Sequence, residues 1–206
     1  MDNDVLQRLE TLNAIGAALS SERDLSSLLE RILEAARGFA RADGGTLYTV
    51  DEDRLHFEVI RNDTLGYVMG GRHGTPINFA PLPLYDADGS GNDSMVVAHA
   101  ALSGHTVNIP DAYTAEGFDF TGTRAFDEKT GYRSQSFLTV PMKDHAGAVI
   151  GVLQLINAKD ANGTVREFTA ADQSLVESLA SQAAIALNNR RLIEQLETLF
   201  ESLISL

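Results

Sequence analysis

A leucine repeat near the C-terminus constrains this chain more than any other feature. Its members recur in alternating steps of four and three residues, at Leu192, Leu196, Leu199, Leu203 and Leu206. This spacing puts them on one stripe of a helix, as in a coiled coil. The same register reaches back to Ile185 and Asn189. An asparagine at such a position lowers stability but fixes register and favours a parallel dimer.

The N-terminal segment carries a second stripe with the same steps, at Val5, Leu9, Leu12, Gly16 and Leu19. Helices from both ends of two chains can form a four-helix interface. The sequence therefore predicts a homodimer, with interface residues Leu9, Leu12, Ile185, Asn189, Leu192, Leu196, Leu199 and Leu203. Alternatively, the last helix packs only against the first helix of its own chain, and the two arrangements are compatible.

Composition excludes several classes of protein. The 206 residues are 44% hydrophobic and 22% charged, which is typical of a folded domain. A net charge of −13 disfavours nucleic acid and anionic membranes as partners. The absence of cysteine excludes disulfides, thiolate metal sites and cysteine nucleophiles. The start shows no secretion signal, and no apolar run reaches about 18 residues, so we expect a cytoplasmic protein.

Hydrophobic periodicity predicts helices at both ends and strands between them. Residues 25–39 form a second amphipathic helix, which the sequence Asp43, Gly44, Gly45 is expected to end with a turn. Predicted hairpins pair residues 46–50 with 55–61 and residues 136–142 with 148–156. A short helix (94–103) and a strand (106–109) lie between them, while residues 112–133 show no clear element. Thr169 is expected to cap the last helix together with Asp172.

This order predicts an α+β fold with an antiparallel sheet. The terminal helices would cover one face of the sheet. Loops and short helices would lie over the other face, where a ligand would bind. The long loop region around residues 76–94 fits such a covering role, because long loops inside compact domains are usually functional.

Four segments in this order resemble the GAF domain family. They are residues 108–113 (NIPDAY), 126–134 (FDEKTGYRS), 138–142 (LTVPM) and 150–157 (IGVLQLIN). The similarity runs from about residue 25 to residue 188 and is greatest to GAF domains of cyclic-nucleotide phosphodiesterases and bacterial signalling proteins. It implies a sheet of about six strands, terminal helices on one face, and ligand-covering loops on the other.

The tail at residues 189–197 (NRRLIEQLE) resembles the linker between a GAF domain and an HD-GYP phosphohydrolase domain. The resemblance implies three parts: a dimerisation helix (1–20), a GAF sensor domain (21–188), and a coiled-coil linker (189–206) to an output domain. HD and GYP motifs are absent from this sequence. We therefore expect no catalytic residues in this chain and place catalysis downstream.

Several positions align with nucleotide contacts in the binding members of the family. They are Asp127, Thr130 and Ser134, with Gln154 on a strand facing the base. Hydroxyls can hold a phosphate, and carboxylate and amide groups can bind a base edge. Alternatively, Asp127 and Thr130 build the turn before the strand.

Aromatic residues in the same region also admit two interpretations. Phe118 and Phe126 could stack on a purine, or they could anchor the loops as a small satellite core. The five histidines show no spacing typical of a metal site, and no metal is predicted. No cofactor is certain; the resemblance implies a cyclic nucleotide or another purine-like ligand.

A structural motif of the nucleotide-binding members is only partly present. Asn157, Phe168 and Asp172 match it. Ala158 stands where the motif has lysine, and Lys159 follows one residue late. We therefore expect the lysine–aspartate bridge of the family to be missing or made differently.

The chain is thus interpreted as a homodimeric sensor domain that transmits ligand state through its last helix. The alternative is a ligand-free dimerisation module whose loops close on their own side chains. A nucleotide-sized cavity walled by Ser134 and Gln154 would favour the sensor. Phenylalanines filling that space would favour the module.

Overall fold

The structure, a computed structural model, describes residues 2–205 and the side chains of residues 3–205, so Leu206 lies outside the described residues. Its elements are α1 (Asp2–Ser21), α2 (Leu25–Ala40), β1 (Ala42–Asp51), β2 (Arg54–Asn62), β3 (Tyr67–Gly70), β4 (Leu82–Pro83), α3 (Val96–Ser103), β5 (Val107–Ile109), α4 (Thr121–Thr130), β6 (Phe137–Lys143), β7 (Val149–Lys159), β8 (Val165–Arg166) and α5 (Ala170–Ile204). The sheet has eight strands: six follow the order β3-β2-β1-β7-β6-β5, while β4 pairs with β2 and β8 pairs with β7. All pairings between these strands are antiparallel, which confirms the expected α+β fold.

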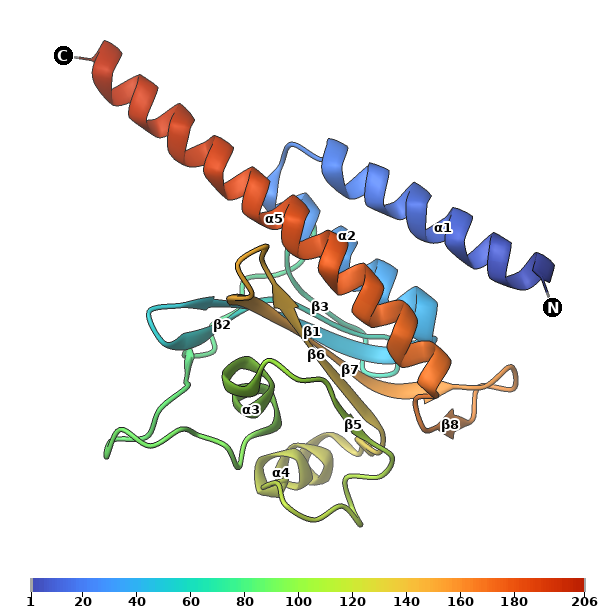
Figure 1. The fold of residues 1–206 in the computed structure, drawn as a ribbon. Helices are drawn as coiled ribbons and strands as arrows, with labels where there is room; N and C mark the ends of the chain where they lie inside the picture. The colour runs from blue at the N-terminus through green and yellow to red at the C-terminus, as the bar shows by residue number, and fades with distance from the viewer. Residues whose placement is uncertain (1, 206) are drawn as a thin grey trace.

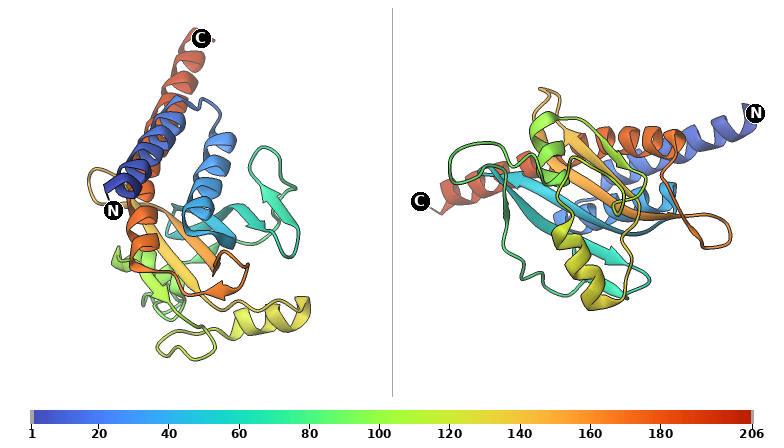
Figure 2. Two further views of the ribbon diagram at one scale, coloured as in Figure 1. Left: turned by 90° about the vertical axis from the view of Figure 1, so that its right-hand side faces the viewer. Right: turned by 90° about the horizontal axis from the view of Figure 1, so that it is seen from below.

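The sheet separates two layers. Helices α2 and α5 cover one face, and α1 lies along the outside of α5 (Figure 1). Helices α3 and α4 and the long loops lie on the other face, as Figure 2 shows from below. The main hydrophobic core fills the space between the sheet and the helix layer, with Leu33, Leu47 and Leu155 fully buried there.

Helix α1 packs on α5 of its own chain. Leu12 and Leu19 are buried, with exposed fractions of 8% and 2%. Gly16 permits the close approach of the two helices, because a Cβ there would collide with the Gln182 side chain. Leu12 therefore belongs to the core of one chain and not to an exposed dimer surface, which corrects its assignment. Leu9 is half exposed, as the dimer hypothesis requires.

The turn after α2 lies earlier than the sequence suggests. Arg41 adopts the left-handed conformation (φ 52°) and caps α2 by donating its backbone N–H to the Arg37 carbonyl. Asp43, Gly44 and Gly45 lie inside strand β1 rather than in a turn. Any side chain at Gly45 would meet Leu33 and Leu155, so glycine here lets α2 pack closely on the sheet.

A β-bulge in β2 redirects its side chains. Leu47 pairs with Val59 and Tyr48 with Phe57, so Glu58 is the extra residue. Val59 belongs to the core under the helices, whereas Leu55, Tyr48 and Phe57 pack in a cluster on the loop side. The bulge thus puts Leu55 and Phe57 of β2 on the loop side, although an unbroken alternation from Val59 would put them on the helix side.

The C-terminal half contains one helix that the sequence did not predict and one helix cap that it did. Helix α4 was not predicted, because residues 112–133 are polar and contain glycine. The cap of α5 is confirmed: Thr169 accepts from the Asp172 backbone N–H, and the Asp172 carboxylate accepts from the Thr169 N–H. None of the described helices is long and apolar enough to cross a lipid bilayer.

Candidate functional site

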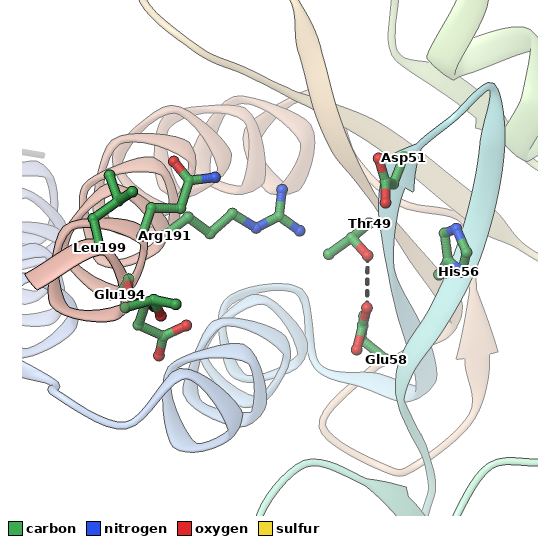
Figure 3. Close-up of a pocket in the computed structure, with 9 residues that line it drawn as sticks. Thr49, Asp51, His56, Glu58, Arg191, Glu194 and Leu199 are labelled. Atoms are coloured by element: carbon green, nitrogen blue, oxygen red, sulfur yellow. Dashed lines mark hydrogen bonds between the residues drawn. The ribbon is translucent and has the colours of Figure 1, made fainter. Parts of the chain in front are cut away.

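An open groove of about 840 Å³ lies between the tip of the β1–β2 hairpin and the C-terminal half of α5. Figure 3 shows Thr49, Asp51, His56 and Glu58 on the hairpin, with the Arg191 side chain extending toward them from α5. Nearly all residues of the groove are polar. Among the described residues, no group of three His, Asp or Glu side chains could hold a metal ion. The groove therefore has little apolar wall with which to hold a small molecule.

A second hollow of about 470 Å³ lies on the loop face of the sheet. Its volume falls in the usual range of ligand sites. Residues of β1, β2, β3, β4, α4, β6 and β7 and of the intervening loops line it: Gly45, Thr46, Tyr48, Phe57, Ile60, Arg61, Asn62, Tyr67, Met69, Phe79, Leu82, Gly122, Thr123, Phe126, Tyr132, Ser134, Phe137, Gln154 and Ile156. We refer to this hollow as the sheet cavity.

Aromatic rings form much of its wall. Phe57 lies between Tyr48 and Phe79, with ring centroids 4.9 and 5.4 Å away. Phe126 of α4 meets Tyr67 of β3 edge to face at 6.4 Å. Phe79 and Phe126 are 56% and 40% exposed. Both would gain burial from a ligand in the cavity, because exposed aromatic surface is costly in water.

Two tyrosines of the wall, Tyr48 and Tyr132, have a raised pKa and remain protonated. Burial raises the pKa of the Tyr48 phenol well above its ordinary value. Burial also raises the pKa of Tyr132, and the neighbouring Asp43 carboxylate adds to the rise. The sheet cavity therefore presents neutral hydroxyl groups at physiological pH.

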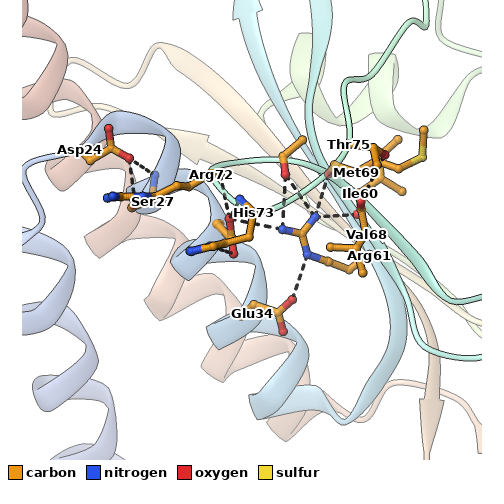
Figure 4. Close-up of polar contacts among 12 residues, drawn as sticks. Asp24, Ser27, Glu34, Ile60, Arg61, Val68, Met69, Arg72, His73 and Thr75 are labelled. Carbon is orange, nitrogen blue, oxygen red and sulfur yellow. Dashed lines mark hydrogen bonds and ion pairs between the residues drawn. The ribbon is translucent and has the colours of Figure 1, made fainter.

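Arg61 is the one charged residue among those lining the sheet cavity, and its side chain is fully engaged elsewhere. Its guanidinium donates to the backbone carbonyls of Ile60 and Met69, at 2.9 and 2.7 Å. It also pairs with Glu30 and Glu34 of α2, each at 3.4 Å. Figure 4 shows this side chain between β2 and α2, on the helix side of the sheet. Arg61 therefore joins β2 to α2 and the β3 loop.

Three of the six predicted ligand residues line the cavity. Gln154 lies at its floor and donates through Nε2 to Thr139 Oγ1 at 3.2 Å. Ser134 is buried and donates its hydroxyl proton to Asp127 Oδ1 at 2.8 Å. Phe126 stands at the mouth. The ligand contacts predicted for these three stay predictions, but the structure brings them together around one space.

The other three predicted ligand residues lie outside the cavity lining. Asp127 is 4% exposed and accepts from the Ser134 N–H, the Ser134 hydroxyl and the Tyr113 hydroxyl. The Thr130 hydroxyl donates to the Phe126 carbonyl at the end of α4. These bonds favour the alternative in which the two residues build the turn before β6, and their predicted ligand contacts stay predictions.

Phe118, the third of these residues, also lies outside the cavity lining. Its ring packs against His99 and Phe120, with centroids 5.4 and 6.5 Å away. These contacts belong to a separate apolar cluster around Phe137 and Ile109. Phe118 thus anchors the loops, as the alternative interpretation held.

Asn157 forms the centre of the structural motif. It has a left-handed backbone (φ 58°), and its side-chain oxygen accepts from the Gln135 and Ser136 N–H groups. Its amide donates to the Arg133 carbonyl at 2.7 Å and to the Tyr132 hydroxyl at 3.0 Å. This one side chain therefore fixes the segment that leads into β6. Phe168, also matched by the motif, is 3% exposed in the main core.

The lysine–aspartate bridge is made differently, as the shifted lysine suggested. Asp172 pairs with Arg166 at 2.6 Å. Lys159 instead pairs with Asp43, a residue that sequence reasoning had assigned to a turn. Asp43 also accepts from the Tyr132 hydroxyl at 2.7 Å and the Thr64 hydroxyl at 2.9 Å.

Asp43 is the functional candidate that the sequence did not reveal. Burial alone would raise the pKa of its carboxyl group, but the hydrogen bonds from Lys159, Tyr132 and Thr64 outweigh this and lower it. Its backbone carbonyl accepts from Arg37 of α2 at 3.0 Å. Asp43 thus connects Tyr132, a wall of the cavity, with the helix layer across the sheet. No local motif marks it, since its partners lie up to 116 residues away.

The C-terminal half of α5 leaves the body of the domain (Figure 1). Its predicted interface residues are exposed in the single chain: Ile185, Asn189, Leu192, Leu196, Leu199 and Leu203. Ile193, Phe200 and Ile204 add further exposed apolar surface. An apolar stripe of this kind is typical of a helix that pairs with another helix.

These features define a sheet with terminal helices on one face and a loop-covered cavity on the other. The sequence profile of the GAF domain matches residues 24–187, and the chain belongs to the GAF domain family.

The chain is 40% identical over 100 residues to the dual 3',5'-cyclic-AMP and -GMP phosphodiesterase 11 of Drosophila melanogaster. The match covers 48% of this chain and only 6% of that protein.

Solved structures show the same fold. The GAF domain of an Acinetobacter phosphoenolpyruvate-protein phosphotransferase has a TM-score of 0.64 at 19% identity, covering 92% of this chain and 98% of that one. A GAF domain/HD domain protein from Geobacter sulfurreducens has a TM-score of 0.56 at 17% identity, covering 84% and 98%.

Proposed function

We propose that this chain is a small-molecule-sensing regulatory domain of a larger bacterial signalling protein. The observation that carries the proposal is the sheet cavity, whose wall includes Ser134 and Gln154. Phe118 and Phe120 pack elsewhere, and Phe126 stands at the mouth instead of filling the space. A module that closes on its own side chains would lack a hollow of about 470 Å³.

The domain acts as a homodimer in this proposal. The support is the exposed apolar stripe on α5, whose spacing suits a parallel coiled coil. Leu9 of α1, which is half exposed, is a further member of the proposed interface. Pairing would bury these side chains, each of which is worth about 1.5–3 kcal/mol when fully removed from water.

Ligand state reaches α5 through the sheet. Tyr132 of the cavity wall bonds Asp43, and the Asp43 backbone accepts from Arg37 of α2, which packs beside α5. A ligand that moves Tyr132 would shift this chain of contacts and so the arrangement of the paired α5 helices. The shift can be no larger than the ligand's difference in affinity for the two arrangements.

The output lies outside this chain and is an HD-GYP phosphohydrolase in our proposal. The resemblance of residues 189–197 to the linker of such proteins supports it, as does the likeness of fold to a protein that joins GAF and HD domains. The fragment itself is regulatory, and we assign it no catalytic residue. The ligand is purine-like, in keeping with the phosphodiesterase relative.

Native mass spectrometry of the purified chain tests the sensor. We expect a small molecule bound to the wild type and lost from Gly122→Phe, because Gly122 lines the cavity and no atom stands within 4 Å of a Cβ there. Ala125→Phe is the matched control, since Ala125 is exposed on the same helix and does not line the cavity. A wild-type chain that binds nothing, even after incubation with cell extract, would favour the ligand-free module.

A further inference from the structure

We infer that the sheet cavity takes an uncharged, planar nitrogen heterocycle with N–H donors, such as a purine nucleoside, and discriminates against its phosphorylated forms. This inference rests on the proposed sensor function and narrows its ligand.

The described lining of the sheet cavity offers no free positive charge to a ligand. Arg61 is the only charged residue among its described lining, and its guanidinium is held on the helix side of the sheet by three backbone carbonyls, Glu30 and Glu34 (Figure 4). A phosphate entering the cavity would meet no free cation. Desolvating an anion without a partner costs several kcal/mol.

The N-terminus of α4 borders the cavity at Gly122 and Thr123. A helix N-terminus favours anions, but a carboxylate is already present here: Asp119 Oδ1 accepts from the Thr121 N–H at 2.9 Å. The nearby cations Arg124 and Arg133 stack on the Tyr113 ring, at 5.8 and 4.0 Å. One N–H group of the helix end is therefore already bonded to a carboxylate, and neither arginine lines the cavity.

Two side-chain oxygens of the lining, those of Ser134 and Gln154, can accept hydrogen bonds from a ligand. Ser134 donates its proton to Asp127, so its oxygen faces the cavity as an acceptor. Gln154 donates through Nε2 to Thr139, which leaves its carbonyl oxygen as an acceptor at the floor. These two oxygens can pair with the N–H groups of a ligand, and a phosphate group has no N–H to offer them.

Aromatic rings form two parts of the cavity wall. Rings of Tyr48, Phe57 and Phe79 stand on one side, and those of Tyr67 and Phe126 meet at another. Planar heterocycles stack on such rings without needing a charge, and stacking of a base on an aromatic side chain is worth about 1–3 kcal/mol. The shape, polarity and charge of the cavity lining thus favour the same class of ligand, an uncharged planar heterocycle.

Isothermal titration of the full chain with matched ligand pairs tests the inference. Adenosine and guanosine are compared with cAMP and cGMP, which differ from them by one phosphodiester charge. We expect each nucleoside to bind at least about tenfold more tightly than its cyclic nucleotide. Gly122→Phe should abolish nucleoside binding, and Ala125→Phe should leave it unchanged. Gln154→Leu should weaken it about tenfold by removing the acceptor.

The outcomes separate the inference from the sensor proposal. Tighter binding of cAMP or cGMP, blocked by Gly122→Phe, would overturn the inference and leave the sensor intact. A phosphorylated molecule found on the wild-type chain by native mass spectrometry would do the same. Failure of all four ligands to bind at millimolar concentration would overturn the inference, and an empty native spectrum in addition would overturn the sensor.

Discussion

Replacing Asp127 by alanine should destabilise the domain without touching the cavity wall. The buried carboxylate accepts from the Ser134 N–H and hydroxyl, both at 2.8 Å, and from the half-buried Tyr113 hydroxyl. Each of the two buried bonds to a charged acceptor is worth about 1.5 kcal/mol, and Tyr113 can bond water instead. Asp127→Ala should therefore lower the free energy of unfolding by about 3 kcal/mol.

Urea unfolding followed by far-ultraviolet circular dichroism measures this loss. With a slope of about 2 kcal/mol per molar urea, the midpoint should fall by about 1.5 M. Asp127→Asn keeps one oxygen acceptor, and its amide can donate to the Ser134 oxygen, so it should cost about 1 kcal/mol. Glu128→Ala, an exposed change on the same helix, should lie within about 0.5 kcal/mol of wild type.

One result would refute the reasoning. If Asp127→Ala unfolds at the same urea concentration as Glu128→Ala but loses ligand affinity, then Asp127 contacts the ligand and does not hold the turn before β6. Of the two interpretations that the sequence allows for Asp127, the ligand contact would then be right.

Three further predictions follow from the contacts. Because the pKa of Asp43 is lowered in the folded state, its contribution to stability is complete above about pH 5 and is lost as the pH falls from the ordinary value of 3.8 through the lower pKa of the folded state. Lys159→Met should flatten this pH dependence in urea titrations, and an unchanged slope would contradict the pairing. Thr169→Ala removes half of the α5 capping box and should cost about 1 kcal/mol, which differential scanning calorimetry would register as a Tm lower by about 2–4 °C. Leu196→Asp should convert the dimer to a monomer, as measured by sedimentation velocity, whereas the exposed change Glu201→Ala should not. A wild-type chain that sediments as a monomer would contradict the pairing of α5 helices.

The terminal helices and the two main hairpins follow from local pattern. Residues 46–50 and 55–61 alternate around a short acidic turn, and they form β1 and β2 as predicted. Thr169 and Asp172 carry the whole capping signal within four residues, so the start of α5 could be located from the sequence. Short-range features of this kind depend on neighbours in the chain.

The site was harder to predict because its contacts are long-range. The role of Asp43 depends on Lys159 and Tyr132, which only the folded sheet brings near. Asp127 aligns with a ligand contact of the family, yet its oxygens are occupied by Ser134 and Tyr113. Burial and hydrogen-bond partners decide such roles, and a pattern of residue types does not contain them.

Helix α4 was missed for a related reason. Its sequence contains Gly122 and three threonines within its ten residues, and these have low intrinsic helix propensity. Phe126 at the cavity mouth and the buried Asp127 hold the helix against the sheet, so tertiary packing outweighs propensity. The bulge at Glu58 likewise changes which face of the sheet the neighbouring side chains of β2 occupy. The alternation of apolar and polar residues in the sequence does not reveal such a bulge.

The central claim is that cavity occupancy changes the arrangement of paired α5 helices. The chain has no cysteine, so Ser202→Cys on the exposed end of α5 can carry a single spin label per chain. Pulsed electron paramagnetic resonance then measures the distance between the labels of two chains, with and without the molecule identified by native mass spectrometry. The account predicts a defined distance that shifts on ligand binding and does not shift in Gly122→Phe. Labels too far apart to interact, or a distance that the ligand leaves unchanged, would contradict it.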